Sequence, residues 1–342
     1  METKALIIGK FMPLHKGHVA MIRWAAEHYD NVNVCILYHE HEPIRLVYRS
    51  EWVKEEFSNL CNVRIDTLKF DPNKLNPSSE SDLVSSQRWW DYLSRYYPDI
   101  THIIGSEKYV QYMAEYAGKE YVIYDEKRNN VHISASEIRN DFITNWHYLA
   151  DSVRRDLSLH ICICGTESSG KTTLCNSIDK DYDSVTVIPE IGRCLIGNAN
   201  SMSFDDLFTN YKIHNNLLDA AKRTNPTPIM LWDTDNITTL SYCKHFIDDE
   251  LFSYSSFMSR QFAPVIANKY IFLEGNVYDM EPGRISENEA DELKNTHIEM
   301  YNKFNIKLYN IKNVGGYNLV TKIIKERLDY ISQILGKNVE YV

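Results

Sequence analysis

Residues 159–172 read LHICICGTESSGKT and set the architecture expected for the second half of the chain. Residues 159–164 form a short apolar run, which is typical of a buried strand in a parallel sheet. Residues 165–172 match the phosphate-binding pattern G-x-x-x-x-G-K-[ST] in full, and a helical segment follows from Thr173 to Ile178. A chain of this length and average composition would match by chance about once in a hundred cases. The sequence therefore predicts a P-loop between a strand and a helix.

The chemistry of a P-loop gives roles to the residues of this stretch. Its glycines let backbone N–H groups turn toward phosphate oxygens, and the following helix N-terminus adds partial positive charge. We expect Lys171 to reach the β- and γ-phosphates of ATP and Thr172 to bind Mg²⁺. A Gly-Ser turn with a solvated lysine is the alternative. The residues expected to bind this nucleotide are Gly165, Ser168, Ser169, Gly170, Lys171, Thr172 and Thr173.

Acidic residues follow two other apolar runs of the second half. In LWDTD, at residues 231–235, Asp233 is the expected Mg²⁺ ligand and Asp235 is a candidate for contact with a ribose or a base. In PEIGR, at residues 189–193, Glu190 is a candidate to accept the proton of an attacking hydroxyl. For each acid, plain solvation at the end of a strand is the alternative.

Two arginines extend the predicted site in the second half. Arg193, the last residue of PEIGR, is a candidate to bind a phosphate or a substrate carbonyl. Arg284 ends the segment EPGR, which follows the strand expected at Tyr270 and could close over ATP as a lid. A surface turn is the alternative for this segment.

Apolar runs alternate with helical patterns along the whole chain, which is the order of a doubly wound α/β fold. The pattern starts afresh at residue 159, so we expect two parallel-sheet domains, residues 1–150 and residues 151–342. The predicted strands are residues 5–8, 32–37, 102–104, 121–124, 159–164, 185–188, 229–232, 270–273 and 306–308. The predicted helices are residues 18–29, 51–60, 90–97, 108–117, 173–178 and 319–335, with a less regular helical pattern over residues 136–157.

The first half concentrates unusual residues in Gly9–His18, which reads GKFMPLHKGH. His15 and His18 lie three residues apart where a loop enters a helix, so they face the same side. Gly17 lets a ligand approach the backbone closely. Imidazoles and helix N–H groups can stabilise the charge that builds on an α-phosphate as pyrophosphate leaves. Metal binding, for which no third ligand has a convincing spacing, and an ordinary turn are the alternatives.

A second anion site is indicated by Ile133–Arg139, which reads ISASEIR. Ser134 and Glu137 form the S-x-x-E pattern of a capping box, so a helix begins here. The same helix start offers N–H groups, the hydroxyls of Ser134 and Ser136, and the guanidinium of Arg139. Together these groups suit the β- and γ-phosphates of ATP. A helix start with no other role is the alternative.

The composition restricts the class of protein. A net charge of −10 over 342 residues argues against a long basic surface for nucleic acid. The seven cysteines are scattered without a C-x-x-C pair, which favours reduced thiols in the cytoplasm over disulfides or a zinc site. No apolar run approaches the roughly 20 residues that span a bilayer. We expect small-molecule partners and neither nucleic acid nor membrane, and a homo-oligomer stays open.

The motifs of the two halves resemble two known groups of proteins. GKFMPLHKGH is similar to the G-x-F-x-P-x-H-x-G-H signature of the HIGH-type nucleotidyltransferases, and ISASEIR is similar to their I-S-x-T-x-I-R signature, with Ser136 where threonine is usual. GSEKY at residues 105–109 and DEKR at residues 125–128 also look like that group. GTESSGKTTL, PEIGR and DTDNITT are similar to the kinase domain of the bifunctional NadR-type proteins. The resemblance covers nearly the whole chain in the domain order of those proteins.

This resemblance implies a Rossmann-like nucleotidyltransferase domain followed by a P-loop kinase domain, both using ATP, with Mg²⁺. The kinase would phosphorylate ribosylnicotinamide to nicotinamide mononucleotide (NMN), and the first domain would join NMN to AMP, giving NAD and pyrophosphate. Some relatives carry an N-terminal DNA-binding segment, whereas the first strand here begins by residue 5, so we expect no DNA binding. The family's lid usually reads Asp-Gly-x-Arg, and this chain has Asp279 followed by EPGR. In the first domain, the residues implied are Gly9, Phe11, His15, Gly17, His18, Ser134, Ser136 and Arg139; in the second, Lys171, Thr172 and Asp233.

Other acceptors and other classes of function stay open. Trp89 and Trp90 are candidates to stack on the cationic ring of nicotinamide, although adjacent tryptophans more often divide between core and surface. The same ATP chemistry could act on a pantetheine-phosphate, glycerol-phosphate or flavin acceptor. A regulator in which the P-loop senses a nucleotide is a further alternative.

Overall fold

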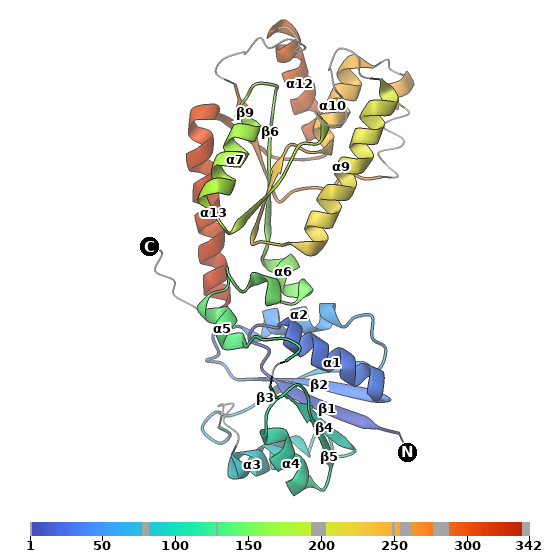
Figure 1. Ribbon diagram of the computed structural model, residues 1–342, viewed down its shortest axis with the longest axis vertical. Coiled ribbons are helices and arrows are strands. Elements are labelled where there is room, and N and C mark those ends of the chain that lie inside the picture. The colour runs from blue at the N-terminus through green and yellow to red at the C-terminus, as the bar shows by residue number, and fades with distance from the viewer. Residues whose placement is uncertain are drawn as a thin grey trace. The chain divides into compact units, whose positions relative to one another are not determined.

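The computed structural model describes residues 2–76, 82–127, 129–192, 203–247, 250–253, 262–275 and 287–336. The chain divides into two compact units: unit 1 holds Met1–Asp156 and Asp329–Val342, and unit 2 holds Leu157–Leu328 (Figure 1). The break therefore falls a few residues beyond the boundary expected from the sequence, and residues 329–336 belong with unit 1. Each unit is built around its own parallel sheet.

Unit 1 contains a sheet of five parallel strands: β1 (Lys4–Gly9), β2 (Asn31–Tyr38), β3 (Val63–Lys69), β4 (His102–Gly105) and β5 (Glu120–Ile123). Their order is β3-β2-β1-β4-β5. Ile7 in the central strand pairs with Val34 on one side and Ile104 on the other, and it has no exposed surface. The chain proceeds from β1 toward one edge and later to β4 on the opposite side. The carboxyl ends of β1 and β4 therefore form a switch point, where such sheets bind ligands.

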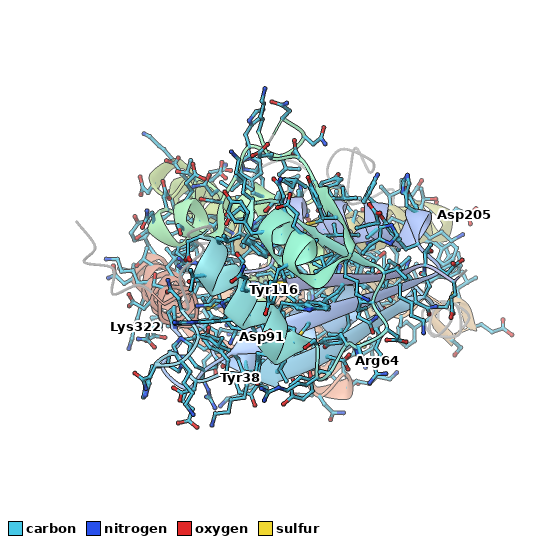
Figure 2. All side chains as sticks on the ribbon, turned by 90° about the horizontal axis from the view of Figure 1, so that it is seen from below. Tyr38, Arg64, Asp91, Tyr116, Asp205 and Lys322 are labelled. Atoms are coloured by element: carbon cyan, nitrogen blue, oxygen red, sulfur yellow. The ribbon has the colours of Figure 1, made fainter. Side chains whose placement is uncertain are left out.

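Helices cover both faces of this sheet. They are α1 (Lys16–His28), α2 (Leu46–Glu56), α3 (Leu83–Leu93), α4 (Tyr109–Ala117), α5 (Ala135–Asn140), the 3₁₀ helix η1 (Trp146–Tyr148) and α6 (Asp151–Leu157). Figure 1 shows α1 and α2 on one face and α3 and α4 on the other. Leu93, Val110 and Met113 pack in one apolar cluster beneath the sheet. A 3.2 Å hydrogen bond from the Tyr116 hydroxyl to Asp91 also joins α4 to α3 at the surface (Figure 2).

Unit 2 repeats this architecture with strands β6 (Leu159–Gly165), β7 (Val185–Ile188), β8 (Ile229–Asp233), β9 (Lys269–Glu274) and β10 (Leu308–Lys312). The five strands are parallel and lie in the order β10-β9-β6-β8-β7. Every residue of β6 is buried, which is why it reads as a continuous apolar run. The helices are α7 (Lys171–Asp181), α9 (Phe204–Thr224), α10 (Asn236–Phe246), α12 (Glu287–Lys303) and α13 (Asn313–Ile334), whose last turns belong to unit 1.

The two doubly wound sheets confirm the predicted fold class, whereas several element predictions were wrong. Strand β3 was not predicted, because its residues alternate between exposed and partly buried instead of forming an apolar run. Helices α9, α10 and α12 were not predicted either. The helices predicted at 51–60 and 90–97 begin earlier in the structure, as α2 and α3, and the helical pattern over 136–157 is divided among α5, η1 and α6. In the described part of the chain, no helix combines the length and the apolar character needed to cross a membrane.

Candidate functional site

A cavity of about 340 Å³ lies at the carboxyl ends of β1 and β4 in unit 1. Its wall combines residues from the two motifs of the first half and from the segments 105–109 and 125–128. Trp89 lines this cavity, whereas Trp90 is 8% exposed and packs in the apolar cluster beneath the sheet. The predicted residues that line the cavity are Gly9, Phe11, His15, Gly17, His18, Trp89, Ser134, Ser136 and Arg139.

The two histidines of GKFMPLHKGH form a stacked pair at the start of α1. Their ring centroids are 3.7 Å apart, and the edge of Phe11 contacts His18 with centroids 5.0 Å apart. His15 is the N-cap of the helix, and its Nδ1 accepts the Gly17 N–H at 3.2 Å. A neutral imidazole that accepts at Nδ1 carries its proton on Nε2. His15 is therefore held as a hydrogen-bond donor beside the cavity.

Arg139 joins the two predicted motifs of unit 1. Its Nη1 donates to the carbonyl of Met12, within GKFMPLHKGH, and its Nη2 donates to the Ser136 hydroxyl at 3.0 Å. Ser134 caps α5 through a full capping box, in which its Oγ is 2.6 Å from Glu137 Oε2 and 3.2 Å from the Glu137 backbone nitrogen. The structure therefore brings the histidine loop and the start of α5 together, as the two-motif phosphate clamp requires.

A buried ion pair behind the cavity was missed by sequence reasoning. Arg49 has no exposed surface, and its Nη1 donates to the carbonyls of Lys10 at 2.7 Å and Leu37 at 3.1 Å. Glu42 Oε2 lies 2.5 Å from Arg49 Nη2, and Glu42 Oε1 lies 3.4 Å from Lys10 Nζ. Burial lowers the pKa of Arg49, although Glu42 opposes this shift. Lys10 lines the cavity, so this pair fixes both its backbone and its ammonium group. The pattern of sequence around Arg49 carries no signal of this contact.

The P-loop of unit 2 has a backbone that only glycine accepts at two positions. Gly165 has φ +142°, and a Cβ there would lie 2.4 Å from the carbonyl oxygen of Leu273. Gly170 has φ +85° and is the N-cap of α7. Both conformations are strongly disfavoured for residues with a side chain. The loop therefore ends with N–H groups at a helix N-terminus, where phosphates bind.

Lys171, Thr172 and Asp233 meet at this loop. Lys171 Nζ donates to the carbonyls of Gly165 at 3.1 Å and Thr166 at 2.8 Å. The Thr172 hydroxyl donates to Asp233 Oδ2 at 2.6 Å, which joins the start of α7 to the end of β8. Thr173 follows on α7 and is exposed. The predicted meeting of loop and strand end is thus present in the structure.

Buried oxygens without partners remain beside the P-loop. Asp233 is 3% exposed and Ser169 is fully buried, yet within the described ranges neither Asp233 Oδ1 nor Ser169 Oγ has a hydrogen-bond partner. The described part of the chain holds no cluster of three or more His, Cys, Asp or Glu able to bind a metal alone. One carboxylate and one hydroxyl fit Mg²⁺, which is usually held by few side chains together with phosphates and water.

The other predicted residues of unit 2 have different positions. Glu190 follows β7, and Ile188 pairs with Trp232, so Glu190 lies along the same edge of the sheet as Asp233. Asp235 is fully buried as the N-cap of α10; its Oδ1 accepts from the Tyr301 hydroxyl at 2.7 Å and the Thr238 N–H at 3.1 Å. Burial raises the pKa of Asp235. Arg193 and the lid segment with Arg284 lie outside the described residues.

Comparisons with known domain families match each unit to a different model. The model of cytidylyltransferase-like domains matches residues 6–141, which run from β1 to α5. The model described as AAA domain matches residues 160–317, which run from β6 into α13. The two matches follow the order of the two units along the chain.

Two curated relatives are similar to a large part of the chain. The trifunctional NAD biosynthesis/regulator protein NadR of Escherichia coli is 25% identical over 264 residues, which are 72% of this chain and 63% of that protein. NadR of Salmonella typhimurium is 25% identical over 259 residues, which are 70% of this chain and 62% of that protein. The chain therefore spans less than two thirds of the length of these relatives in the matched region.

A solved structure, of a NadR protein in complex with NR, shares the fold along the whole chain. It covers 100% of this chain and 98% of its own, with a TM-score of 0.53 and 19% identity. The two domain matches, the curated relatives and the shared fold together show that the chain is similar to NadR proteins, with a cytidylyltransferase-like domain preceding a P-loop domain.

Proposed function

We propose that this protein is a bifunctional enzyme of NAD biosynthesis. Unit 2 transfers the γ-phosphate of ATP to the 5′-hydroxyl of ribosylnicotinamide, giving NMN. Unit 1 joins NMN to the AMP part of a second ATP, giving NAD and pyrophosphate. The observation that carries this proposal is that one chain brings two phosphate-binding motifs together with their partner segments, one pair at the Arg139–Met12 contact and one at the contact of Thr172 with Asp233. The names of its curated relatives support the choice of NAD biosynthesis.

The adenylyl transfer of unit 1 needs positioned donors and no covalent intermediate. An oxygen of the NMN phosphate attacks the α-phosphorus of ATP, and the bond from that phosphorus to pyrophosphate breaks. We assign His15 and His18 to the α-phosphate, where their donors oppose the charge that builds in the transition state. Arg139 takes the departing phosphates from the opposite wall of the cavity. Lys10, held by Glu42, adds a further positive charge from the segment that carries the histidines.

The phosphoryl transfer of unit 2 depends mainly on position and charge. The 5′-hydroxyl attacks the γ-phosphorus, the bond to ADP breaks, and the hydroxyl proton passes to Glu190. Lys171 exchanges its two carbonyl partners for oxygens of the β- and γ-phosphates. Thr172 and Asp233 are the residues that would hold Mg²⁺, which when bound neutralises charge on these phosphates.

Trp89 is the aromatic residue that we assign to the nicotinamide ring in unit 1. It lines the cavity, its Nε1 donates to the Asn76 carbonyl at 3.2 Å, and the edge of Phe70 contacts it with centroids 5.0 Å apart. These contacts hold the indole in place for stacking on a cationic ring. The proposal includes a cytoplasmic location, since both reactions consume ATP.

A pair of variants tests the proposal, with each serving as the control for the other. We expect the wild-type protein with Mg-ATP to convert NMN to NAD and pyrophosphate. His18→Ala should lower this rate by about 100-fold or more and leave NMN formation from ribosylnicotinamide intact. Lys171→Ala should abolish NMN formation and leave NAD formation intact. Chromatographic assay of NMN and NAD checks both, and absence of NAD from NMN would refute the acceptor assigned to unit 1.

A further inference from the structure

Buried polar atoms without partners gather on α9 of unit 2. Asn210 is 7% exposed and His214 is 1% exposed, and the two lie one helical turn apart. Within the part of the chain that the structure describes, neither Asn210 Oδ1 nor His214 Nε2 has a hydrogen-bond partner. Buried polar groups nearly always have one, because leaving the bond unmade is costly. A ligand with matching polar groups would supply both partners.

Asn210 lies close to the proposed reacting edge of the sheet. A Cβ built on Gly192 would be 3.4 Å from Asn210 Nδ2 and 3.6 Å from Glu190 Oε1, so both side chains face the same short segment. Glu190 is the group to which we assign the proton of the acceptor hydroxyl. Asn210 therefore borders the place where the acceptor nucleoside meets the γ-phosphate, and His214 lies one helical turn further along α9.

Helix α10, which contacts α9 (Figure 1), adds a third buried polar atom of this kind. Asn236 is fully buried, and its Nδ2 donates to Asn215 Oδ1 at 2.7 Å. Asn215 Oδ1 also accepts from the Val265 N–H at 3.1 Å, which fixes the orientation of both amides. Asn236 Oδ1 has no partner among the described residues. The two helices thus present neutral polar atoms whose directions are set by their neighbours.

The charges nearby favour one kind of acceptor. Glu190 follows β7, and burial lowers the pKa of His214 to about 4, so its imidazole is neutral. The carboxyl group of Glu190 and the neutral amides favour a cationic ring. A carboxylate on that ring would lose its hydration next to a group of like charge.

We propose that Asn210 and His214 select an uncharged carboxamide over a carboxylate on the cationic ring of the acceptor nucleoside. This inference rests on the kinase activity proposed for unit 2. The carboxamide both donates and accepts hydrogen bonds, which matches the donor and acceptors of Asn210 and His214. A carboxylate can only accept hydrogen bonds, and it adds a negative charge. The two residues thereby determine specificity and take no part in phosphoryl transfer.

The test compares ribosylnicotinamide with ribosylnicotinate as kinase substrates of the full chain. We expect kcat/KM to favour ribosylnicotinamide by at least about 100-fold. Asn210→Ala and His214→Gln should raise the KM for ribosylnicotinamide by about 10-fold or more, change kcat less, and reduce the preference. Asn216→Ala, on the exposed side of α9, is the matched control and should change neither constant. A cooperative thermal unfolding transition of unit 2 in each variant verifies that unit 2 is folded.

Each outcome decides the inference. Equal kcat/KM values for the two nucleosides in the wild-type protein would refute the proposed selection, while the proposed kinase activity would still hold. An unchanged preference in both folded variants, with equal losses on the two nucleosides, would reduce Asn210 and His214 to structural residues. If the wild-type protein phosphorylates neither nucleoside while NMN still gives NAD, the proposed function of unit 2 fails and the inference fails with it.

Discussion

At the scale of single residues, the glycines of GKFMPLHKGH make room for rings. A Cβ on Gly17 would lie 3.1 Å from Cε1 and Nδ1 of His15, and a Cβ on Gly9 would lie 3.0 Å from the Phe11 ring. Neither glycine has a positive φ. The imidazole of His15, and not the backbone of α1, is therefore what requires glycine at residue 17.

Gly17→Ala separates activity from stability. Alanine favours the helix by up to about 1 kcal/mol over glycine, so the free energy of unfolding should stay the same or rise. The added Cβ should displace the His15 ring and lower kcat/KM for NAD formation by about 10-fold or more. Steady-state kinetics and thermal unfolding of the same preparation check both effects. Glu27→Ala, at the exposed far end of α1, is the control, and full activity of Gly17→Ala would show that this close approach has no catalytic role.

At the scale of elements, the buried N-cap of α10 should contribute more than an exposed one. Asp235 binds both the Thr238 N–H and the Tyr301 hydroxyl without exposure, whereas Ser203 caps α9 at the surface. Asp235→Ala should lower the free energy of unfolding of unit 2 by about 2–4 kcal/mol, because the buried Thr238 N–H loses its side-chain acceptor and the Tyr301 hydroxyl loses one of its two partners. Ser203→Ala should cost about 1 kcal/mol. Denaturant unfolding measures both, and equal losses would contradict a special role for the buried cap.

The burial of each element explains why the sequence pattern predicted some strands and helices and missed others. The central strands β1 and β6 are buried on both faces, so their apolar runs predict them directly. Helix α9 buries Asn210 and His214 on the same side as Leu207 and Leu218, and these polar residues interrupt the apolar periodicity.

The same distinction holds for the candidate site. The meetings of Met12 with Arg139 and of Thr172 with Asp233 follow from motifs, because each motif carries a known phosphate-binding pattern. The bonds from Arg49 to the Lys10 and Leu37 carbonyls depend on long-range packing of a loop and a helix, and no local pattern encodes them.

At the scale of the molecule, unit 2 buries histidines that must stay neutral. Burial lowers the pKa of His160 and His214 to about 4 and that of His297 to about 3, from the usual 6.5. The unfolded chain therefore binds protons that the folded unit rejects, and stability present above pH 6.5 is lost as the pH falls toward 4. Each histidine should cost about 2 kcal/mol between pH 7 and pH 5. Unit 2 should accordingly lose stability in acid.

Thermal unfolding across this range of pH provides the measurement. We expect the transition of unit 2 to move to lower temperature between pH 7 and pH 5. His160 donates through Nε2 to Asn225 Oδ1 at 2.8 Å and accepts from Trp232 Nε1 at 3.2 Å, so its neutral form is locked in place. His160→Gln should lower stability at pH 7 and weaken its dependence on pH. A dependence identical to that of the wild type would rule out His160 as a source of the acid sensitivity.

The bond from Arg139 to the Met12 carbonyl has a consequence for the entropy of nucleotide binding. The guanidinium is ordered when unit 1 folds, held by Met12 on one side and by Ser136 on the other. Little rotamer freedom is therefore left for ATP to remove when it meets this arginine. Lys171 starts from bonds to two carbonyls of its own loop, which ATP must break before the lysine can bind phosphate. The two units thus differ in the entropy and enthalpy of binding ATP. Unit 1 binds it with a preorganised arginine, whereas unit 2 binds it by exchanging the hydrogen-bond partners of Lys171.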